Sequence, residues 1–365
     1  MADPQPSAKP SALRRRLPLA AWWRRLRTLR DEPSFVEGSL FSVGCILFVG
    51  LVWWFLTRGE GDARLISAYA LPAPADTFRS FPALWQRGLS LSALTSLGRV
   101  LGGFIVAIAL AVPLGLLAGS YLRLGAFLKP IGIFGRNVPI AALLALTLVW
   151  FGIGDLQKVM FIFLAAVAFV LFDSAAAARA VPDRFLETAC TLGARHNWTK
   201  GLRLSLLIAA GYALLASVGW FALQHEGAFA ISLAEADGDA PTLAKAAASG
   251  AFWWRTVAGF TIGFALWFPL LSHQVLRKVI MPMAMPEVVN SLRLLFGLAF
   301  GYIMLAEVIN AQRGLGYIIN MSQRQGPREH IYLCLLIITL LAWGIDRFIL
   351  WCQHMAFPYL KNAQD

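Results

Sequence analysis

The chain has 365 residues, of which 58% are hydrophobic and only 14% are charged, with a mean hydropathy of +0.64. In soluble domains about a quarter of the residues are charged, so this composition excludes an ordinary soluble protein and indicates a polytopic membrane protein. The net charge of +12 does not indicate nucleic-acid binding, because the basic residues lie in short segments between apolar runs. Such segments are typical of positive charge kept on the cytoplasmic side of a membrane.

Residues 1–38 are a basic segment with eight Lys and Arg residues and no convincing signal peptide. Within it, Trp22 to Arg30 mixes bulky apolar side chains with arginines. This mixture suits a helix lying at an anionic membrane surface, and equally a basic tail that only fixes the orientation of the chain. The sequence leaves both alternatives open.

Apolar runs long enough to cross a bilayer follow at 39–57, 92–119, 137–153, 157–178, 202–224, 253–276, 286–310 and 331–353. No segment alternates like the strands of a membrane barrel, so the expected fold is all-α with about eight transmembrane helices. The basic loop 179–201 is expected inside and the acidic loop 225–251 outside. Eight crossings then place both termini in the cytoplasm.

Three pairs of glycines are spaced four residues apart within these apolar runs: Gly115 and Gly119, Gly259 and Gly263, and Gly297 and Gly301. Small residues at this spacing allow two helix backbones to approach closely. We therefore expect helix contacts at these positions.

The polar stretch from Phe185 to Gly193 lies between two spans and is compatible with a short helix. A helix bearing Glu187, with small residues after it, can lie in a groove of a soluble partner. Gly193 can adopt positive φ, which suits a helix end followed by a sharp turn. Taken alone, the stretch fits an ordinary capped loop with a Glu near a helix start better than a docking helix.

Several pieces in a fixed order resemble the integral-membrane permeases of ATP-binding-cassette (ABC) importers, in the branch that handles nitrate, sulfonates, taurine and bicarbonate. The resemblance covers about three-quarters of the chain, and its main pieces are Ser96–Phe104, Pro113–Gly119, Trp150–Gly154, Glu187–Gly193, Val279–Pro286, Ala306–Glu307 and Gly314–Tyr317. It implies a type I importer-like permease core, with the Glu187 stretch as the loop that couples the chain to an ATPase. The residues implied in coupling are Glu187, Thr188, Ala189, Gly193 and Ala194.

The resemblance further implies a subunit without an active site of its own, in which ATP and Mg are bound only by partner subunits. The implied partners are two cytoplasmic ATPase subunits, a second permease subunit, expected to be an identical copy, and an external substrate-binding protein. The implied location is the bacterial inner membrane. No Walker-type loop, zinc-protease motif or serine-nucleophile motif occurs in the sequence, and no metal site is expected.

One feature departs from the family pattern, because Ile280 of the Ile-x-x-Pro region lies 87 residues after Gly193 instead of about ten. We interpret 201–278 as an inserted transmembrane hairpin. The predicted organisation is therefore a basic segment at 1–38, the first part of the permease at 39–200, the hairpin at 201–278, and the last two spans with the C-terminus at 279–365.

Polar residues within the spans are the candidates for the translocation path: Asn137, Asn290, Arg293, Glu307 and Asn310. Arg293 can meet an anionic substrate or a carboxylate on another helix, and the sequence does not choose between them. For Asp173, Arg255, Glu287 and Asp346, which lie near helix ends, we expect side chains that reach the headgroups.

Two other functions are compatible with parts of this pattern. The same fold can move a lipid or another hydrophobic cargo, with the added hairpin serving that cargo. An ion-coupled secondary transporter would need broken helices and an internal repeat, and the two halves show no repeat.

Overall fold

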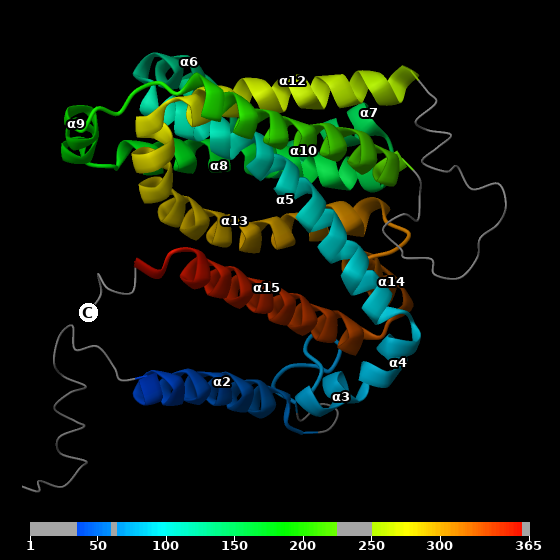
Figure 1. The fold of residues 1–365 in the computed structure, drawn as a ribbon. Helices are drawn as coiled ribbons and strands as arrows, with labels where there is room; N and C mark the ends of the chain where they lie inside the picture. The colour runs from blue at the N-terminus through cyan, green and yellow to red at the C-terminus, as the bar shows by residue number, and fades with distance from the viewer. Residues whose placement is uncertain (1–34, 60–63, 225–249, 360–365) are drawn as a thin grey trace, which may run out of the picture. The chain divides into compact units, whose positions relative to one another are not determined.

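The computed structural model describes residues 35–59, 64–224 and 250–359. Within these ranges the chain is helical, and the only extended pairing is a single bridge between His196 and His273. The predicted interfacial segment at 10–32 and most of the acidic loop lie outside the described residues. The elements, coloured along the chain in Figure 1, are α2 (Phe35–Thr57), α3 (Pro74–Arg79), α4 (Phe81–Gln86), α5 (Leu89–Ser120), α6 (Leu122–Asn137), α7 (Ile140–Phe151), α8 (Asp155–Arg179), α9 (Asp183–Thr191), α10 (Trp198–Gln224), α12 (Gly250–Ser272), the π-helix η2 (Leu276–Ile280), α13 (Met281–Asn310), α14 (Leu315–Gln325) and α15 (Arg328–Ala356).

Among the described residues, seven helices are long and apolar enough to cross a membrane, or eight if the bent pair α6–α7 counts as one span. This agrees with the predicted all-α fold of about eight spans. The chain forms two units, residues 1–74 and 75–365. In the first unit, α2 is exposed along most of its apolar length, as a helix facing lipid would be, and Trp53 Nε1 donates a hydrogen bond to the carbonyl of Pro72 at 3.0 Å.

The span expected at 137–153 differs from the structure. Its helix, α7, covers only 12 residues, or about 18 Å, which is too short for a bilayer core of about 30 Å. α7 instead follows α6 with a bend of 101°. The bend lies at Val138 and Pro139, whose ψ angles of 126° and 124° are extended. Val138 is extended because a residue before proline is driven out of the helical region.

In the second unit, α5 and α8 pack against each other along their length because glycines remove the side chains between them. A Cβ atom at Gly103, Gly115 or Gly119 would lie 2.5–2.6 Å from a backbone carbonyl oxygen of α8. The predicted contact at Gly115 and Gly119 is therefore confirmed. The core then extends to α13 and α15 through a cluster of aliphatic and aromatic residues, in which the rings of Phe104 and Phe296 meet edge to face at 5.3 Å.

Helices α10 and α12 form the pair that fills the predicted hairpin range, and they lie side by side in Figure 1. Gly259 and Gly263 face Tyr212, where a Cβ atom would approach to 2.6–2.7 Å, so this predicted close contact is confirmed as well. The Tyr212 hydroxyl donates to the carbonyl of Ala109 on α5 and accepts from Trp267 Nε1 at 2.9 Å. The hairpin is thus tied to the core, while its origin as an insertion stays a prediction.

The third glycine pair is not a helix contact. A Cβ atom at Gly297 or Gly301 would meet nothing within 4 Å among the described residues. Both glycines lie on the exposed side of α13, so the prediction of close packing there was wrong.

Candidate functional site

The short helix α9 is the exposed connection between α8 and α10, and Figure 1 shows it beyond one end of the second unit. No side chain of α9 is fully buried. Leu186 and Ala189, three residues apart, turn inward and pack on the core cluster that contains Leu276 and Ile280. Glu187 and Thr188 are exposed, as a docking surface requires.

The outward side of α9 also presents apolar side chains. Leu192 is 82% exposed and Phe185 is 38% exposed. Exposed apolar groups next to Glu187 and Thr188, at an end of the bundle, are typical of a surface that packs against another protein. α9 therefore presents both apolar and polar side chains on its exposed surface, as a small protein interface does.

Gly193 ends α9 in the geometry expected from the sequence. Its φ is +80°, in the left-handed region, and its N–H donates to the carbonyl of Cys190 at 3.0 Å. The N–H of Ala194 donates to the carbonyl of Ala189, also at 3.0 Å. These two bonds define a Schellman motif, which satisfies the last carbonyls of the helix and turns the chain sharply back. Ala194 then packs with Ala189 on the core.

After this turn, the chain is fixed to the junction between α12 and α13. The N–H of Asn197 donates to the carbonyl of Ser272 at 2.8 Å, and the N–H of Arg195 donates to Gln274 Oε1 at 3.2 Å. The rings of His196 and His273 meet edge to face at 5.5 Å. Burial, and secondarily the neighbouring His196, lowers the pKa of His273. These contacts connect the end of α9 to the segment between α12 and η2.

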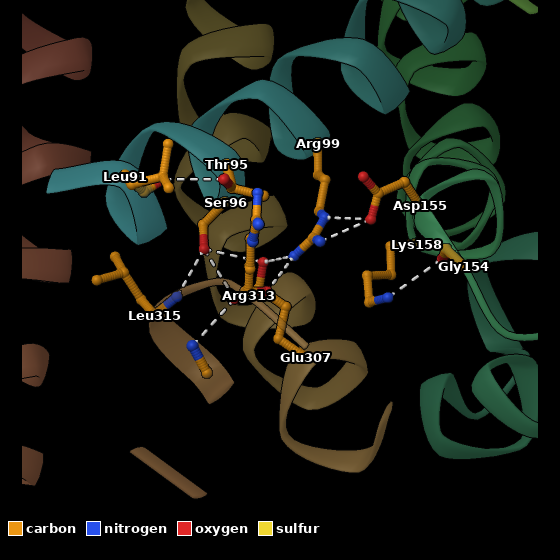
Figure 2. Close-up of polar contacts among 11 residues, drawn as sticks. Leu91, Thr95, Ser96, Arg99, Gly154, Asp155, Lys158, Glu307, Arg313 and Leu315 are labelled. Atoms are coloured by element: carbon orange, nitrogen blue, oxygen red, sulfur yellow. Dashed lines mark hydrogen bonds and ion pairs between the residues drawn. The ribbon is translucent and has the colours of Figure 1, made fainter. Parts of the chain in front are cut away.

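A second group of polar residues lies near the N-terminal end of α8, the end opposite α9 (Figure 2). The Glu307 carboxylate is completely buried and accepts hydrogen bonds from Ser96 Oγ at 2.7 Å, from Arg99 Nη1 at 2.7 Å and from the N–H of Gly316 at 3.0 Å. Arg99 also donates through Nε and Nη2 to Asp155 Oδ1 at 3.0 and 2.6 Å. We call these residues (Ser96, Arg99, Asp155 and Glu307) the ion cluster.

The ion cluster connects three helices that are far apart in the sequence, α5, α8 and α13, and also α14, which follows α13. Ser96 and Arg99 belong to α5, Asp155 begins α8, and Glu307 lies near the end of α13. The N–H of Leu315, which begins α14, donates to Ser96 Oγ at 2.9 Å. A buried charge is stable only when it is paired and hydrogen-bonded, and each cluster member has such partners. The cluster therefore ties these four elements together at this end of the bundle.

The close approach of the backbone to Glu307 explains why glycine occupies two positions at the beginning of α14. Gly314 has a φ of +125°, and a Cβ atom there would lie 2.5 Å from the Glu307 carboxylate. A Cβ atom at Gly316 would lie 2.6 Å from the Cβ of Glu307. Both positions must lack a side chain for the backbone to reach Glu307.

The other candidates for the translocation path are not gathered into one cavity. Asn137 is exposed at the end of α6, where its Nδ2 donates to the carbonyl of Ile133 at 2.8 Å, and Asn290 is half-buried on α13. Arg293 contacts Asp346 of α15 in an ion pair of 2.8 Å. Asn310 is the last residue of α13, and its side chain lies outside the described part of the structure.

The structure thus selects one of the two alternatives for Arg293, a carboxylate on another helix. The expectation that Asp346 only reaches toward the headgroups was wrong, because its side chain lies beside Arg293. Sequence reasoning also missed Ser96, Arg99 and Asp155 as members of the ion cluster. Arg99 was the available signal, because a charge within an apolar run is costly without a partner.

A pocket of about 490 Å³ lies between α8 and α13 at the end that bears α9. Its polar lining consists of Asp173, Glu287 and Ser291, and Val181 and Pro182 border it where α8 leads into α9. Two carboxylates without a cation among the lining residues do not form an anion-binding site. The pocket is a candidate for one mouth of a path through the protein.

Comparison with known proteins identifies the family. The family described as "Binding-protein-dependent transport system inner membrane component" matches residues 111–238 and 270–356 of this chain. These ranges include α8, α9, α13 and α15. The chain belongs to this family. It is thus a multi-pass inner-membrane permease subunit of the ABC-importer type, and the matched range contains the whole of α9.

Two relatives place the permease in the predicted branch. It is similar to the taurine transport system permease protein TauC of Escherichia coli, with 22% identity over 334 residues, 88% of this chain and 90% of that protein. It is similar to the bicarbonate transport system permease protein CmpB of Synechococcus elongatus, with 22% identity over 332 residues, 87% of this chain and 90% of that protein. A solved structure of the MetNI methionine ABC transporter matches with 16% identity, a TM-score of 0.49, and coverage of 75% of this chain and 98% of that chain.

Proposed function

We propose that the permease forms the path by which a small anion or organic acid, such as nitrate, a sulfonate, taurine or bicarbonate, is imported at the expense of ATP. The observation that supports this most is α9, an exposed short helix with Glu187 outward and Gly193 at its end, within a chain of this family. The names of the relatives support the class of substrate.

In this proposal, two ATPase subunits bind ATP and Mg, and each docks on one α9 of a pair of permease subunits. Glu187, Thr188 and the exposed apolar groups of α9 face the ATPase. Ala189, Gly193 and Ala194 have the complementary role of fixing α9 to the permease core. Because the Schellman turn and the bonds to Ser272 and Gln274 leave α9 little freedom of its own, ATP-driven movement of the docked helix would move α13 with it.

The two ends of the bundle differ in a way that fits alternating access. The ion cluster ties α5, α8, α13 and α14 together at one end, while the pocket between α8 and α13 opens at the α9 end. About 36 Å of α8 separates Asp155 from Arg179, so the two features lie near opposite faces of a membrane. We assign the pocket to release, because Asp173 and Glu287 would disfavour rebinding of an anion.

The proposed orientation places α9 and the C-terminus in the cytoplasm. The Tyr359 hydroxyl, just after α15, donates to the carbonyl of Pro282 at the beginning of α13, at 2.7 Å. The end of α15 and the α9 end of the bundle are therefore on the same side. An identical second permease and an external substrate-binding protein complete the proposed importer.

The test is co-purification of the full chain with a candidate ATPase subunit from the same organism. The matched variants are Glu187→Lys on α9 and Asp76→Lys on α3, because both acids are exposed and only the first lies on the proposed docking surface. Glu187→Lys should reduce recovery of the ATPase subunit at least tenfold, and Asp76→Lys should leave it unchanged. Equal recovery with both variants would contradict docking on α9. ATP-independent uptake driven by an ion gradient would instead favour a secondary transporter.

A further inference from the structure

A second, smaller pocket lies where the C-terminal ends of α5 and α8 meet α6. Its volume is about 120 Å³, enough for a phosphate group but not for a whole phospholipid. Two cations, Lys129 of α6 and Arg179 of α8, line it together with apolar residues. Neither cation belongs to the proposed transport path or to the surface of α9, although Ala176 lines both pockets.

The charge of this pocket is not compensated within the described residues. Lys129 has no hydrogen bond or ion pair there, and Arg179 donates one long hydrogen bond, from Nη2 to the carbonyl of Ala118 at 3.4 Å. Neither cation forms a salt bridge with a carboxylate in the described part of the chain. A guanidinium has five N–H donors, so most donors of Arg179 are available to a ligand.

The shape of the pocket is fixed by close packing. At Gly125, a Cβ atom would lie 2.5 Å from Arg179 Nη2, so the absence of a side chain leaves room for the guanidinium beside α6. At Gly132, a Cβ atom would lie 2.7 Å from the ring of Phe172. Phe172 is therefore held against α6, and it forms an apolar wall of the pocket with Leu128 and Leu171.

The position of the pocket relative to the membrane selects its ligand. Arg179 is the last residue of a helix that is long and apolar enough to cross a membrane, so we expect its guanidinium at the level of the lipid headgroups. Leu171 and Phe172 precede it by eight and seven residues, which places them about 10–12 Å toward the hydrocarbon core. Cations at headgroup depth above an apolar wall match the phosphate and the acyl chain of one phospholipid.

We propose that this pocket binds an anionic phospholipid, with its headgroup phosphate between Lys129 and Arg179 and an acyl chain against Leu128, Leu171 and Phe172. The ordinary orientation effect of basic residues explains positive charge on this side of the membrane. It does not explain why two unpaired cations from different helices share one pocket with a continuous apolar wall.

The test is a titration of the detergent-purified full-length permease with cardiolipin, phosphatidylethanolamine or inorganic phosphate, followed by native mass spectrometry. The wild type should bind one cardiolipin in preference to phosphatidylethanolamine. Each basic residue contributes about a fivefold effect at a membrane surface, so Lys129→Gln/Arg179→Gln should weaken cardiolipin binding about 25-fold. The control Arg123→Gln/Arg203→Gln removes the same charge from exposed residues outside the pocket and should change binding less than twofold.

Three results would overturn the proposal. Equal losses in the pocket variant and in the control would show attraction by overall charge alone. Equal binding of cardiolipin and phosphatidylethanolamine would show that the cations do not select the headgroup. Displacement of cardiolipin by millimolar inorganic phosphate would show a site for the free anion. The single variant Lys129→Gln changes an exposed side chain without partners in the described structure, so it should fold normally and still lose about fivefold.

Discussion

Replacing Arg99 by Met is the most informative perturbation of the permease core, because it removes the only cation that contacts Glu307 in the described structure. The side chains of Arg99 and Glu307 are 4% and 0% exposed, so solvent screens their interaction little. Loss of one partner from a buried ion pair typically costs about 3–5 kcal/mol, since the other charge stays buried without compensation. Glu307 keeps two donors, Ser96 Oγ and the N–H of Gly316, so we expect a loss near the lower value, about 3 kcal/mol.

The loss is measured as the free energy of unfolding in mixed micelles, with tryptophan fluorescence followed during titration with SDS. The matched control is Arg293→Met, the same substitution in an ion pair whose side chains are 22% and 35% exposed. Partly exposed pairs contribute about 0–1 kcal/mol, so the control should be nearly neutral. The double variant Arg99→Met/Glu307→Leu should be more stable than Arg99→Met alone, because the completely buried Glu307 carboxylate is no longer left without a cation. Equal losses for Arg99→Met and Arg293→Met would refute the role of the ion cluster.

Three further predictions concern packing, pH and the end of α9. Gly119→Ala should lower the thermal midpoint of unfolding, because it places a Cβ atom 2.5 Å from a carbonyl oxygen of α8. Gly297→Ala faces open space and should raise the midpoint slightly. The opposite outcome would contradict the packing of α5 on α8. The lowered pKa of His273 contributes stability that is fully present above its ordinary pKa of about 6.5 and is lost as pH falls through the pKa of the folded state. His273→Gln should therefore flatten the pH dependence of the free energy of unfolding below about pH 6.5. An unchanged pH dependence would exclude His273 as its source. Gly193→Ala places a side chain on a residue with φ of +80°, at a cost of about 1 kcal/mol. It should reduce transport-coupled ATP hydrolysis in the reconstituted complex without changing the yield of folded permease. Full coupling in this variant would show that the turn is dispensable.

The local features of the fold could be predicted because neighbouring residues determine them. The apolar runs gave the helices within a few residues, and the glycine pair at Gly115 and Gly119 marked a true helix contact. The position of Gly193 after a short polar helix predicted the positive φ that the structure has. Each of these depends on the geometry of one helix or one turn.

Long-range pairs were beyond the same reasoning. Arg99 and Glu307 are separated by 208 residues, and composition does not reveal which helices become neighbours. Arg293 has the same type of partner, Asp346, on a different helix. The bend between α6 and α7 was missed for another reason. The predicted run began at residue 137, so it contained α7 and left out α6, the first half of the bent pair.

The exposed Cys190 on α9 permits the most direct test of the central claim that this helix is the cytoplasmic docking site for an ATPase. In a variant with Cys45, Cys334 and Cys352 replaced by Ser, a membrane-impermeant maleimide should label Cys190 in inverted inner-membrane vesicles and not in right-side-out vesicles. Binding of the ATPase subunit should protect Cys190 from the reagent. Labelling from the opposite face, or labelling that the bound ATPase leaves unchanged, would contradict the proposed function.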